Sequence, residues 1–228
     1  MDLSRLSDVQ RRAVMTTEGA VLVLAGAGSG KTSVLTNRVA YLINEKGIDP
    51  YNILAITFTN KAAGEMKERI ERIVDTDTSS MIVSTFHSMC ARFLRMDADK
   101  IGYTRDFTIY DRDAANTLMK KVLNELRIDD KILTYRYCLN LISSAKNASS
   151  KQSVSAYIAD NCDGDPEDML AIYERYSRAM RAENAMDFDD LLLNMLRVLK
   201  ENDRARDYYQ RRFRYVLVDE YQDTNSVQ

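Results

Sequence analysis

The feature that most constrains this chain is a glycine-rich loop that ends in a lysine and a threonine. It follows the apolar residues 21–24 and consists of Ala25, Gly26, Ala27, Gly28, Ser29, Gly30, Lys31 and Thr32. Glycines let such a loop curl until its backbone N–H groups point inward at an anion. The lysine then lies beside the β- and γ-phosphates of a nucleotide, and the threonine hydroxyl ligates Mg²⁺. The loop therefore predicts a triphosphate site between a strand at 21–24 and a helix at 31–44, although Ala25 stands where the strict pattern has glycine.

A second motif supplies the acids that this chemistry needs. The apolar run 215–218 leads directly into Asp219 and Glu220. Asp219 is the expected ligand of Mg²⁺, directly or through water, and Glu220 is expected to orient and deprotonate the attacking water. Two acids after a strand are a weak signal alone. Their pairing with Lys31 and Thr32 predicts a P-loop NTPase that hydrolyses its nucleotide, with Glu220 and Lys31 as catalytic residues.

Composition and charge narrow the class of protein further. The chain has 228 residues, a formal net charge of −2, three cysteines and one histidine. No global basic field marks a nucleic-acid surface, so DNA contacts must come from local patches. The cysteines form neither a disulfide framework nor a metal-ligand pattern, which favours free thiols in a reducing compartment. Because the sequence shows no long apolar stretch and no signal peptide, we expect a soluble cytoplasmic protein without membrane partners.

The apolar runs outline a domain that is interrupted by an insert. Continuous apolar runs predict parallel strands, covered on both faces, at 21–24, 53–58, 81–84 and 215–218. Helical spacing predicts helices at 31–44, 61–74, 87–96, 188–199 and 204–213. This alternation is typical of a doubly wound α/β domain. From about residue 111 to 214 the strand runs vanish and apolar residues recur at helical spacing, which predicts an all-helical insert.

Together, these motifs resemble those of the UvrD/PcrA/Rep-type superfamily 1 ATP-dependent DNA helicases, and the resemblance covers the whole chain. Residues 6–14 resemble the adenine-reading Q motif, and the other matches are 25–32 to motif I, 56–63 to motif Ia, 84–88 to motif Ib and 219–224 to motif II. Gln10 suits adenine because an amide both donates and accepts hydrogen bonds. Two positions depart from the family. Ser7 replaces its usual Asn and still caps a helix, and Ser33 replaces an Arg that helps to sandwich adenine in relatives.

The resemblance implies a RecA-like P-loop NTPase fold with a parallel sheet and an all-helical inserted subdomain. The RecA-like domain, 1A, would comprise residues 1–111 and 185–228, and the insert, 1B, residues 112–184. Family members use ATP and Mg²⁺ to move 3′ to 5′ on single-stranded DNA and to unwind duplex from single-strand/duplex junctions. The implied location is therefore the bacterial cytoplasm, on the nucleoid. The implied nucleotide-binding residues are Gln10, the loop residues 25–32 and Ser33.

Two strand ends carry the predicted DNA contacts. The carboxyl edge of a parallel sheet is where α/β proteins bind ligands. The resemblance places single-stranded DNA there, on Phe58, Thr59, Asn60, Lys61, Thr85, Phe86 and His87. A phenyl ring would stack on a base, and the polar side chains would bind phosphates. The alternative is structural, with Phe58 in the core and Asn60 as a helix cap.

A basic stretch in the insert is a further candidate surface. It contains Lys131, Arg136, Lys146 and Lys151, with no acid between residues 131 and 151. Such a stretch either meets phosphates or forms a solvated helix face. Both interpretations stay open from the sequence.

The chain ends where a helix is beginning, which leads us to expect a truncated piece of a longer helicase that is inactive alone. In related domains the next strand inserts between the phosphate-loop strand and the motif II strand. Without it, we expect either that 215–218 pairs directly with 21–24 or that another segment or a second chain fills the slot, because unpaired backbone in a buried sheet is costly. In both cases we expect Asp219 and Glu220 to be displaced from Lys31.

Three other functions remain open from the sequence. A helicase subunit of a helicase–nuclease recombination complex shares these motifs, and an NTPase switch would use motifs I and II without acting on DNA. A nucleic-acid-binding module could also have lost catalysis. The presence of Lys31, Thr32, Asp219 and Glu220 argues against this last function.

Overall fold

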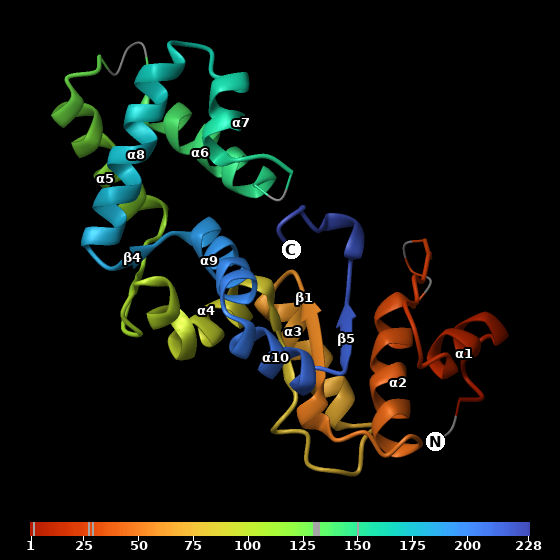
Figure 1. Cartoon of the computed structure of the whole chain (residues 1–228). Helices are drawn as coiled ribbons and strands as arrows, with labels where there is room; N and C mark the ends of the chain where they lie inside the picture. The colour runs from red at the N-terminus through yellow and green to blue at the C-terminus, as the bar shows by residue number, and fades with distance from the viewer. Residues whose placement is uncertain (2, 27, 29, 130–132, 150) are drawn as a thin grey trace. The chain divides into compact units, whose positions relative to one another are not determined.

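The computed structural model describes residues 1, 3–26, 28, 30–129, 133–149 and 151–228, which form two compact units (Figure 1). The first unit comprises residues 1–86 and 207–223, and the second comprises residues 87–206 and 224–228. The first contains a parallel sheet and the second is mainly helical. The predicted fold class, α/β with a parallel sheet and a large helical part, is confirmed.

A three-stranded parallel sheet lies at the centre of the first unit. Its strand order is β2 (Ile82–Thr85), β1 (Ile53–Thr57) and β5 (Tyr215–Val218). All five residues of β1 are buried, as expected for the central strand of a covered parallel sheet. The register pairs Thr57 with Thr85 and Ile56 with Val218, so the three strands end at one edge. The polar residues that follow the strands are therefore arranged along a single carboxyl edge.

Two helices pack against this sheet. α2 (Lys31–Asn44) and α3 (Asn60–Glu71) form one core with strand residues, and this core contains Val39, Leu42, Met66, Ile70, Ile53, Ala55 and Leu217. α1 (Asp8–Met15) contacts α2. Two short 3₁₀ turns, η1 (Pro50–Asn52) and η3 (Tyr221–Asp223), precede β1 and follow β5. This packing fixes the start of α2 and the end of β5, the two places where the sequence predicts the nucleotide site.

The strand predicted at 21–24 is wrong. The structure has no strand there, and the apolar side chains are exposed, with Leu22 at 67% and Leu24 at 86%. Among the described residues, β5 pairs only with β1, so its other edge has no partner strand. An apolar run forms a parallel strand only when a neighbour supplies the ladder. Residues 21–24 therefore form no strand.

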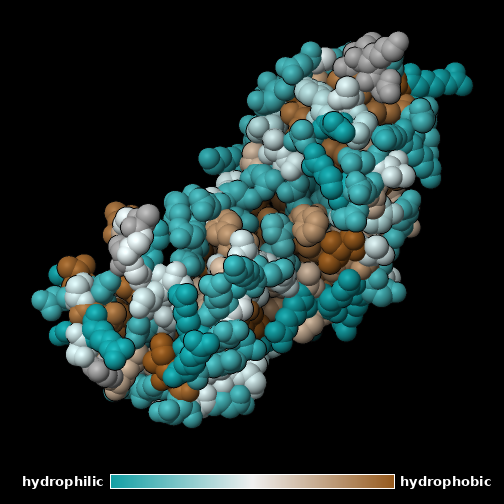
Figure 2. Space-filling model, turned by 180° about the vertical axis from the view of Figure 1, so that it is seen from behind, coloured by the Kyte–Doolittle hydropathy of each residue, from teal (hydrophilic) through white to brown (hydrophobic). Residues whose placement is uncertain are grey.

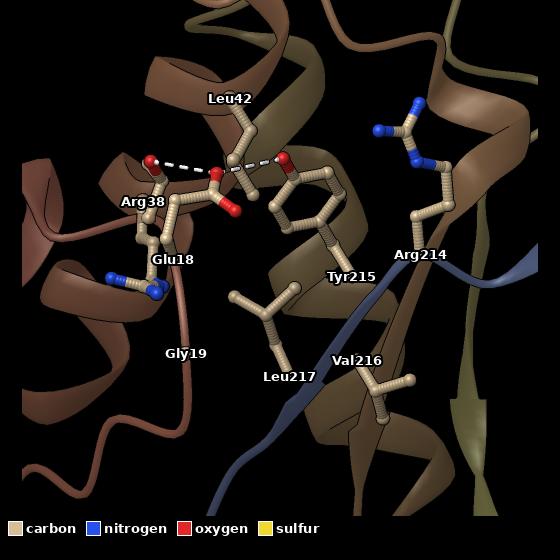
Figure 3. Close-up of a pocket in the computed structure, with 9 residues that line it drawn as sticks. Glu18, Gly19, Arg38, Leu42, Arg214, Tyr215, Val216 and Leu217 are labelled. Atoms are coloured by element: carbon tan, nitrogen blue, oxygen red, sulfur yellow. Dashed lines mark hydrogen bonds between the residues drawn. The ribbon is translucent and has the colours of Figure 1, made fainter.

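The slot beside β5 is hollow. A pocket of about 390 Å³ lies along the strand, between residues 17–19, α2 and β5 (Figure 3). Its lining consists of Thr17, Glu18, Gly19, Arg38, Leu42, Arg214, Tyr215, Val216 and Leu217. Two predicted repairs of the sheet are therefore wrong: within the described part of the chain, β5 does not pair with 21–24, and no other segment adds a strand at this edge. A second chain in the slot stays a prediction.

The second unit is built mainly from helices. α5 (Arg112–Leu126), α6 (Tyr135–Ala148), α7 (Val154–Asn161) and α8 (Pro166–Ala182) share a core that includes Met119, Ile142, Ile158 and Tyr176. A two-residue parallel pair, β3 (Thr108–Ile109) with β4 (Ala185–Met186), brackets these helices. β4 corrects the prediction that no strand occurs between about residues 111 and 214. The domain division at 112–184 stays a prediction.

Further helices flank these in sequence, and one of them, α10 (Asp203–Arg212), begins in the second unit and ends in the first. α4 (Phe86–Asp97), the 3₁₀ helix η2 (Ala98–Ile101) and α9 (Phe188–Glu201) lie before and after the bracketed helices in sequence, and α10 leads toward β5. Asp187 begins α9 with a capping box, because its carboxylate accepts the Asp190 N–H at 2.8 Å and Asp190 accepts the Asp187 N–H at 3.2 Å. Such reciprocal bonds satisfy donors that a helix start otherwise leaves unpaired.

A buried ion cluster links α6 to the start of α9. Lys146 Nζ lies 2.7 Å from Asp187 Oδ2 and 2.7 Å from Asp190 Oδ1, and the lysine side chain is only 4% exposed. Tyr176 of α8 donates its hydroxyl to Asp187 at 3.4 Å. Lys146 is therefore wrongly placed in the predicted basic patch, because a buried lysine with two carboxylate partners does not meet phosphates. Arg136 and Lys151 are exposed, and Lys131 lies outside the described residues.

The surface is largely polar in the view of Figure 2. Hydrophilic residues cover most of that face, and hydrophobic residues show there in small patches. Within the described residues, none of the helices combines the length and the apolar character that crossing a membrane requires. The three cysteines are free thiols, as predicted, with Cys90 and Cys138 buried and Cys162 partly exposed.

Candidate nucleotide site and strand-end residues

The glycine-rich loop ends at the first turn of α2. Gly30 is the N-cap of this helix and has a φ of 83°, in the left-handed region where a side chain is strained. No side chain caps α2, so its first-turn N–H groups have no capping partner of that kind. A helix start of this type favours phosphate through those donors and the helix dipole. Ala27 and Ser29 lie outside the described residues.

Motif II lies next to Lys31 and Thr32. The Asp219 N–H donates to the Ile56 carbonyl at 2.8 Å, which extends the β1–β5 ladder by one residue. Lys31 Nζ lies 3.6 Å from Glu220 Oε2, and a hydrogen bond with Thr32 acts on the Asp219 carboxylate. The predicted displacement of the two acids is therefore wrong. β1 holds β5 from its paired side, and α2 packs into the same core, so both halves of the site are fixed without a further strand.

The two acids differ in their electrostatic surroundings. Asp219 is 8% exposed, and burial raises its pKa, while Lys31 and the hydrogen bond with Thr32 oppose that effect. The hydrogen bond from Gln222 lowers the pKa of Glu220, and Lys31 adds to it. Glu220 also has a φ of 50°, which a residue other than glycine rarely adopts. Hydroxyl and carboxylate oxygens are the donors that Mg²⁺ prefers, so the pair of Thr32 and Asp219 fits that ion.

The Q-motif residues lie at the start of α1. Ser7 caps the helix, since its hydroxyl accepts the Gln10 N–H at 3.3 Å and the Ser7 N–H donates to Gln10 Oε1 at 2.9 Å. The predicted cap at Ser7 is confirmed. A methyl group added at Gly30 would lie 3.2 Å from Gln10 Nε2. The Gln10 amide is thus adjacent to the end of the phosphate loop.

Ser33 occupies the first turn of α2 with an exposed side chain. Asn37 donates its amide to the Ser33 carbonyl at 2.8 Å and to the Ser33 hydroxyl at 3.3 Å. A serine and an amide therefore stand at a surface where the resemblance led us to look for an arginine.

At the carboxyl edge, Phe58 and Phe86 follow neighbouring strands. Their rings meet edge-on, with centroids 6.2 Å apart and an interplanar angle of 68°. Thr59 is the N-cap of α3, because its hydroxyl accepts the Ala62 N–H at 3.1 Å. The alternative that Asn60 caps this helix is therefore wrong, since Asn60 is its first residue. Lys61 is exposed.

The predicted DNA contacts at the end of β2 are less exposed than Thr59, Asn60 and Lys61. Thr85 is 7% exposed at the end of β2. His87 packs edge-on against Phe188, with ring centroids 5.7 Å apart. Burial lowers the pKa of His87, and Asp189 partly opposes this. The DNA-binding role of all these residues stays a prediction.

Sequence reasoning missed Arg38, whose guanidinium holds the end of α1. The signal was its position on α2, four residues after Val34 and four before Leu42. Val34 and Leu42 are buried, at 4% and 0% exposure. A charged residue on the apolar face of a helix needs specific partners.

The fold and site define a class of protein. An α/β unit whose glycine loop opens a helix, with two acids beside the loop's lysine and threonine, is a P-loop nucleotide-binding unit. Residues 6–228 match the UvrD/REP helicase N-terminal domain, and the chain belongs to this family.

Curated relatives agree with the family assignment. The ATP-dependent DNA helicase PcrA of Staphylococcus aureus is 45% identical over 231 aligned residues, which cover 99% of this chain and 31% of that protein. The protein of the same name from Staphylococcus epidermidis is 45% identical over 226 residues, with the same two shares. The chain thus spans less than a third of the length of these relatives.

Proposed function

We propose that this chain is the N-terminal ATP-binding part of an ATP-dependent DNA helicase that moves 3′ to 5′ on single-stranded DNA. The remaining helicase domains would be its partners in the full-length protein. The observation that carries the proposal is the approach of Lys31 to Glu220, at 3.6 Å, beside Thr32 and Asp219. Family membership and the similarity to PcrA support the same function.

Each residue of the nucleotide site has a proposed role. Lys31 would bind the β- and γ-phosphates, and the N–H groups of the loop and of α2 would bind the phosphate oxygens. Thr32 and Asp219 would hold Mg²⁺, which neutralises phosphate charge when it is bound. Glu220 would accept a proton from the attacking water. Gln10 would recognise the adenine from the start of α1.

The strand ends would contact DNA. Phe58 and Phe86 offer aromatic faces to bases, while Thr59, Asn60 and Lys61 lie where phosphates would pass. Residues 112–184 would form the helical subdomain 1B, and residues 1–111 and 185–228 the domain 1A. The common carboxyl edge of the three strands supports the proposed DNA contacts.

The test of the nucleotide site is the change Lys31→Ala. Calorimetric titration of Mg-ATP into the chain should show weaker binding by about 1.5–3 kcal/mol, the range for a hydrogen bond to a charged group. Lys67→Ala is the matched control, because Lys67 is 52% exposed on α3 and forms an ion pair with Glu71. Equal affinity of the wild type and Lys31→Ala would refute the assignment of Lys31.

A further inference from the structure

Arg38 connects α2 to the far end of α1. Its Nη1 group donates to the Ala13 carbonyl at 2.6 Å and also to the Thr16 carbonyl. Thr16 is the C-cap of α1, so these carbonyls belong to the last turn of that helix. The last carbonyls of a helix lack partners within it, and a cation there also complements the helix dipole. One guanidinium therefore serves as the C-terminal clamp of α1.

The segment after α1 is held from a second direction. Tyr215 of β5 donates its hydroxyl to Glu18 Oε1 at 3.2 Å, and Thr17 donates to the same oxygen at 3.4 Å. Figure 3 shows Glu18 and Tyr215 pointing toward one another beside Arg38. Burial lowers the pKa of Arg38, and the electrostatic effects of Glu18 and Tyr215 partly oppose this. The end of α1 is thus tied to both the phosphate-loop helix and the motif II strand.

α1 depends on these ties because it buries little apolar surface. Val14 is its only buried residue, and the other residues from Asp8 to Met15 are partly or fully exposed. A single buried side chain fixes neither the direction nor the rotation of a helix of 8 residues. Its opposite end carries Gln10, whose amide lies beside Gly30 of the phosphate loop. A shift at the Arg38 end would therefore move Gln10 relative to the loop.

We propose that Arg38 is a positioning residue for base recognition, which acts through α1 on Gln10 and not on the triphosphate. The inference rests on the proposed function, because it requires that Gln10 contact the base of a nucleotide bound at Lys31. Lysine cannot replace Arg38 fully. Arg38 reaches both carbonyls through Nη1, and a lysine ammonium lies one bond closer to Cα, so it falls short of that position.

The test separates the base from the phosphates. Dissociation constants of the chain for Mg-ATP and for Mg-tripolyphosphate are measured by calorimetry for the wild type, Arg38→Lys, Gln10→Ala and the double variant. Arg38→Lys should weaken ATP binding about fivefold, as for one lost hydrogen bond, and leave tripolyphosphate binding unchanged. In the Gln10→Ala background, Arg38→Lys should have no further effect on ATP. Arg72→Lys, at a residue 75% exposed on the surface, is the matched control.

Two outcomes would overturn the inference. Equal losses for ATP and tripolyphosphate in Arg38→Lys would make Arg38 a general support of the fold. Additive effects of Arg38→Lys and Gln10→Ala on ATP would show that Arg38 does not act through Gln10. Failure of the proposed function looks different, since Lys31→Ala would then leave the binding of both ligands unchanged.

Discussion

At the scale of single residues, burial distinguishes the predicted DNA contacts from one another. Phe58 is partly exposed at the end of β1, and its ring forms a T-shaped pair with that of Phe86. Thr85, by contrast, is 7% exposed at the end of β2. A base stacks only on an aromatic face that solvent reaches, so Phe58 is a candidate for base stacking, while the buried Thr85 has little surface with which to contact a phosphate.

Replacing Phe58 tests this role. In the full-length protein, Phe58→Ala should weaken the binding of oligo-dT by about 1–3 kcal/mol, the size of one base–aromatic stack. Fluorescence anisotropy at several salt concentrations gives the affinity, which should fall as salt rises because phosphate contacts release counterions. An unchanged affinity, with the unfolding midpoint also unchanged, would assign Phe58 to core packing.

The three thiols provide an independent test of residue burial. Burial raises the pKa of Cys90 to about 12 and that of Cys138 to about 11. Because the thiolate is the reactive form, both should react slowly with a disulfide reagent at neutral pH. Cys162 is partly exposed, so one thiol per native chain should react fast. Cys162→Ser should abolish this fast phase, and a fast phase that persists in Cys162→Ser would contradict the described packing.

At the scale of elements, the ion cluster of Lys146 fastens α6 to α9. Removing one partner of a buried ion pair leaves an uncompensated charge, which typically costs about 3–5 kcal/mol. We therefore expect Lys146→Met to lower the free energy of unfolding of the chain by that amount near pH 7.5. Urea unfolding, monitored by circular dichroism, measures this free energy. Lys151→Met, at an exposed lysine, is the matched control.

The pH dependence of this variant has a defined sign. In the wild type, burial opposes ionisation of Asp187, but Lys146 outweighs it and lowers the pKa, whereas burial raises the pKa of Asp190 to about 6. A carboxyl group whose pKa is lower in the folded than in the unfolded state stabilises the fold at neutral pH, and this stabilisation is lost as pH falls. A carboxyl group whose pKa is raised by folding has the opposite effect, so stability increases as pH falls. Without Lys146 both pKa values should rise, so the variant should gain stability as pH falls toward 5. A deficit that stays constant between pH 7.5 and 5 would contradict the cluster.

The same scale shows what the sequence could predict. α2 and β5 have the predicted bounds, because a glycine-rich loop and an acid pair mark their ends locally. The prediction of a strand at 21–24 was wrong because an apolar run indicates only a preference for burial, while a strand also needs a neighbouring strand to pair with. Lys146 was placed in a basic patch because its partner Asp187 lies 41 residues away in sequence. Arg38 was missed for the same reason, since its carbonyl acceptors lie 25 and 22 residues before it.

At the scale of the whole molecule, we expect the chain to bind ATP without hydrolysing it efficiently. The site residues Lys31, Thr32, Asp219 and Glu220 lie together in this chain, so we expect the chain alone to bind Mg-ATP. The chain nevertheless spans 31% of its PcrA relatives. The resemblance places the arginines that neutralise transition-state charge, and the second RecA-like domain, outside the motifs that this chain carries.

We therefore expect the chain to bind Mg-ATP weakly and to hydrolyse it hardly at all, with or without single-stranded DNA. A missing transition-state arginine typically lowers the rate by about 10³–10⁵. Steady-state phosphate release from residues 1–228 and from the full-length protein, each with oligo-dT, measures the difference. In the full-length protein, Glu220→Gln should still bind ATP but not turn it over, since the amide cannot accept the proton of water. Robust DNA-stimulated turnover by the chain alone would show that these 228 residues already contain every group that the reaction needs.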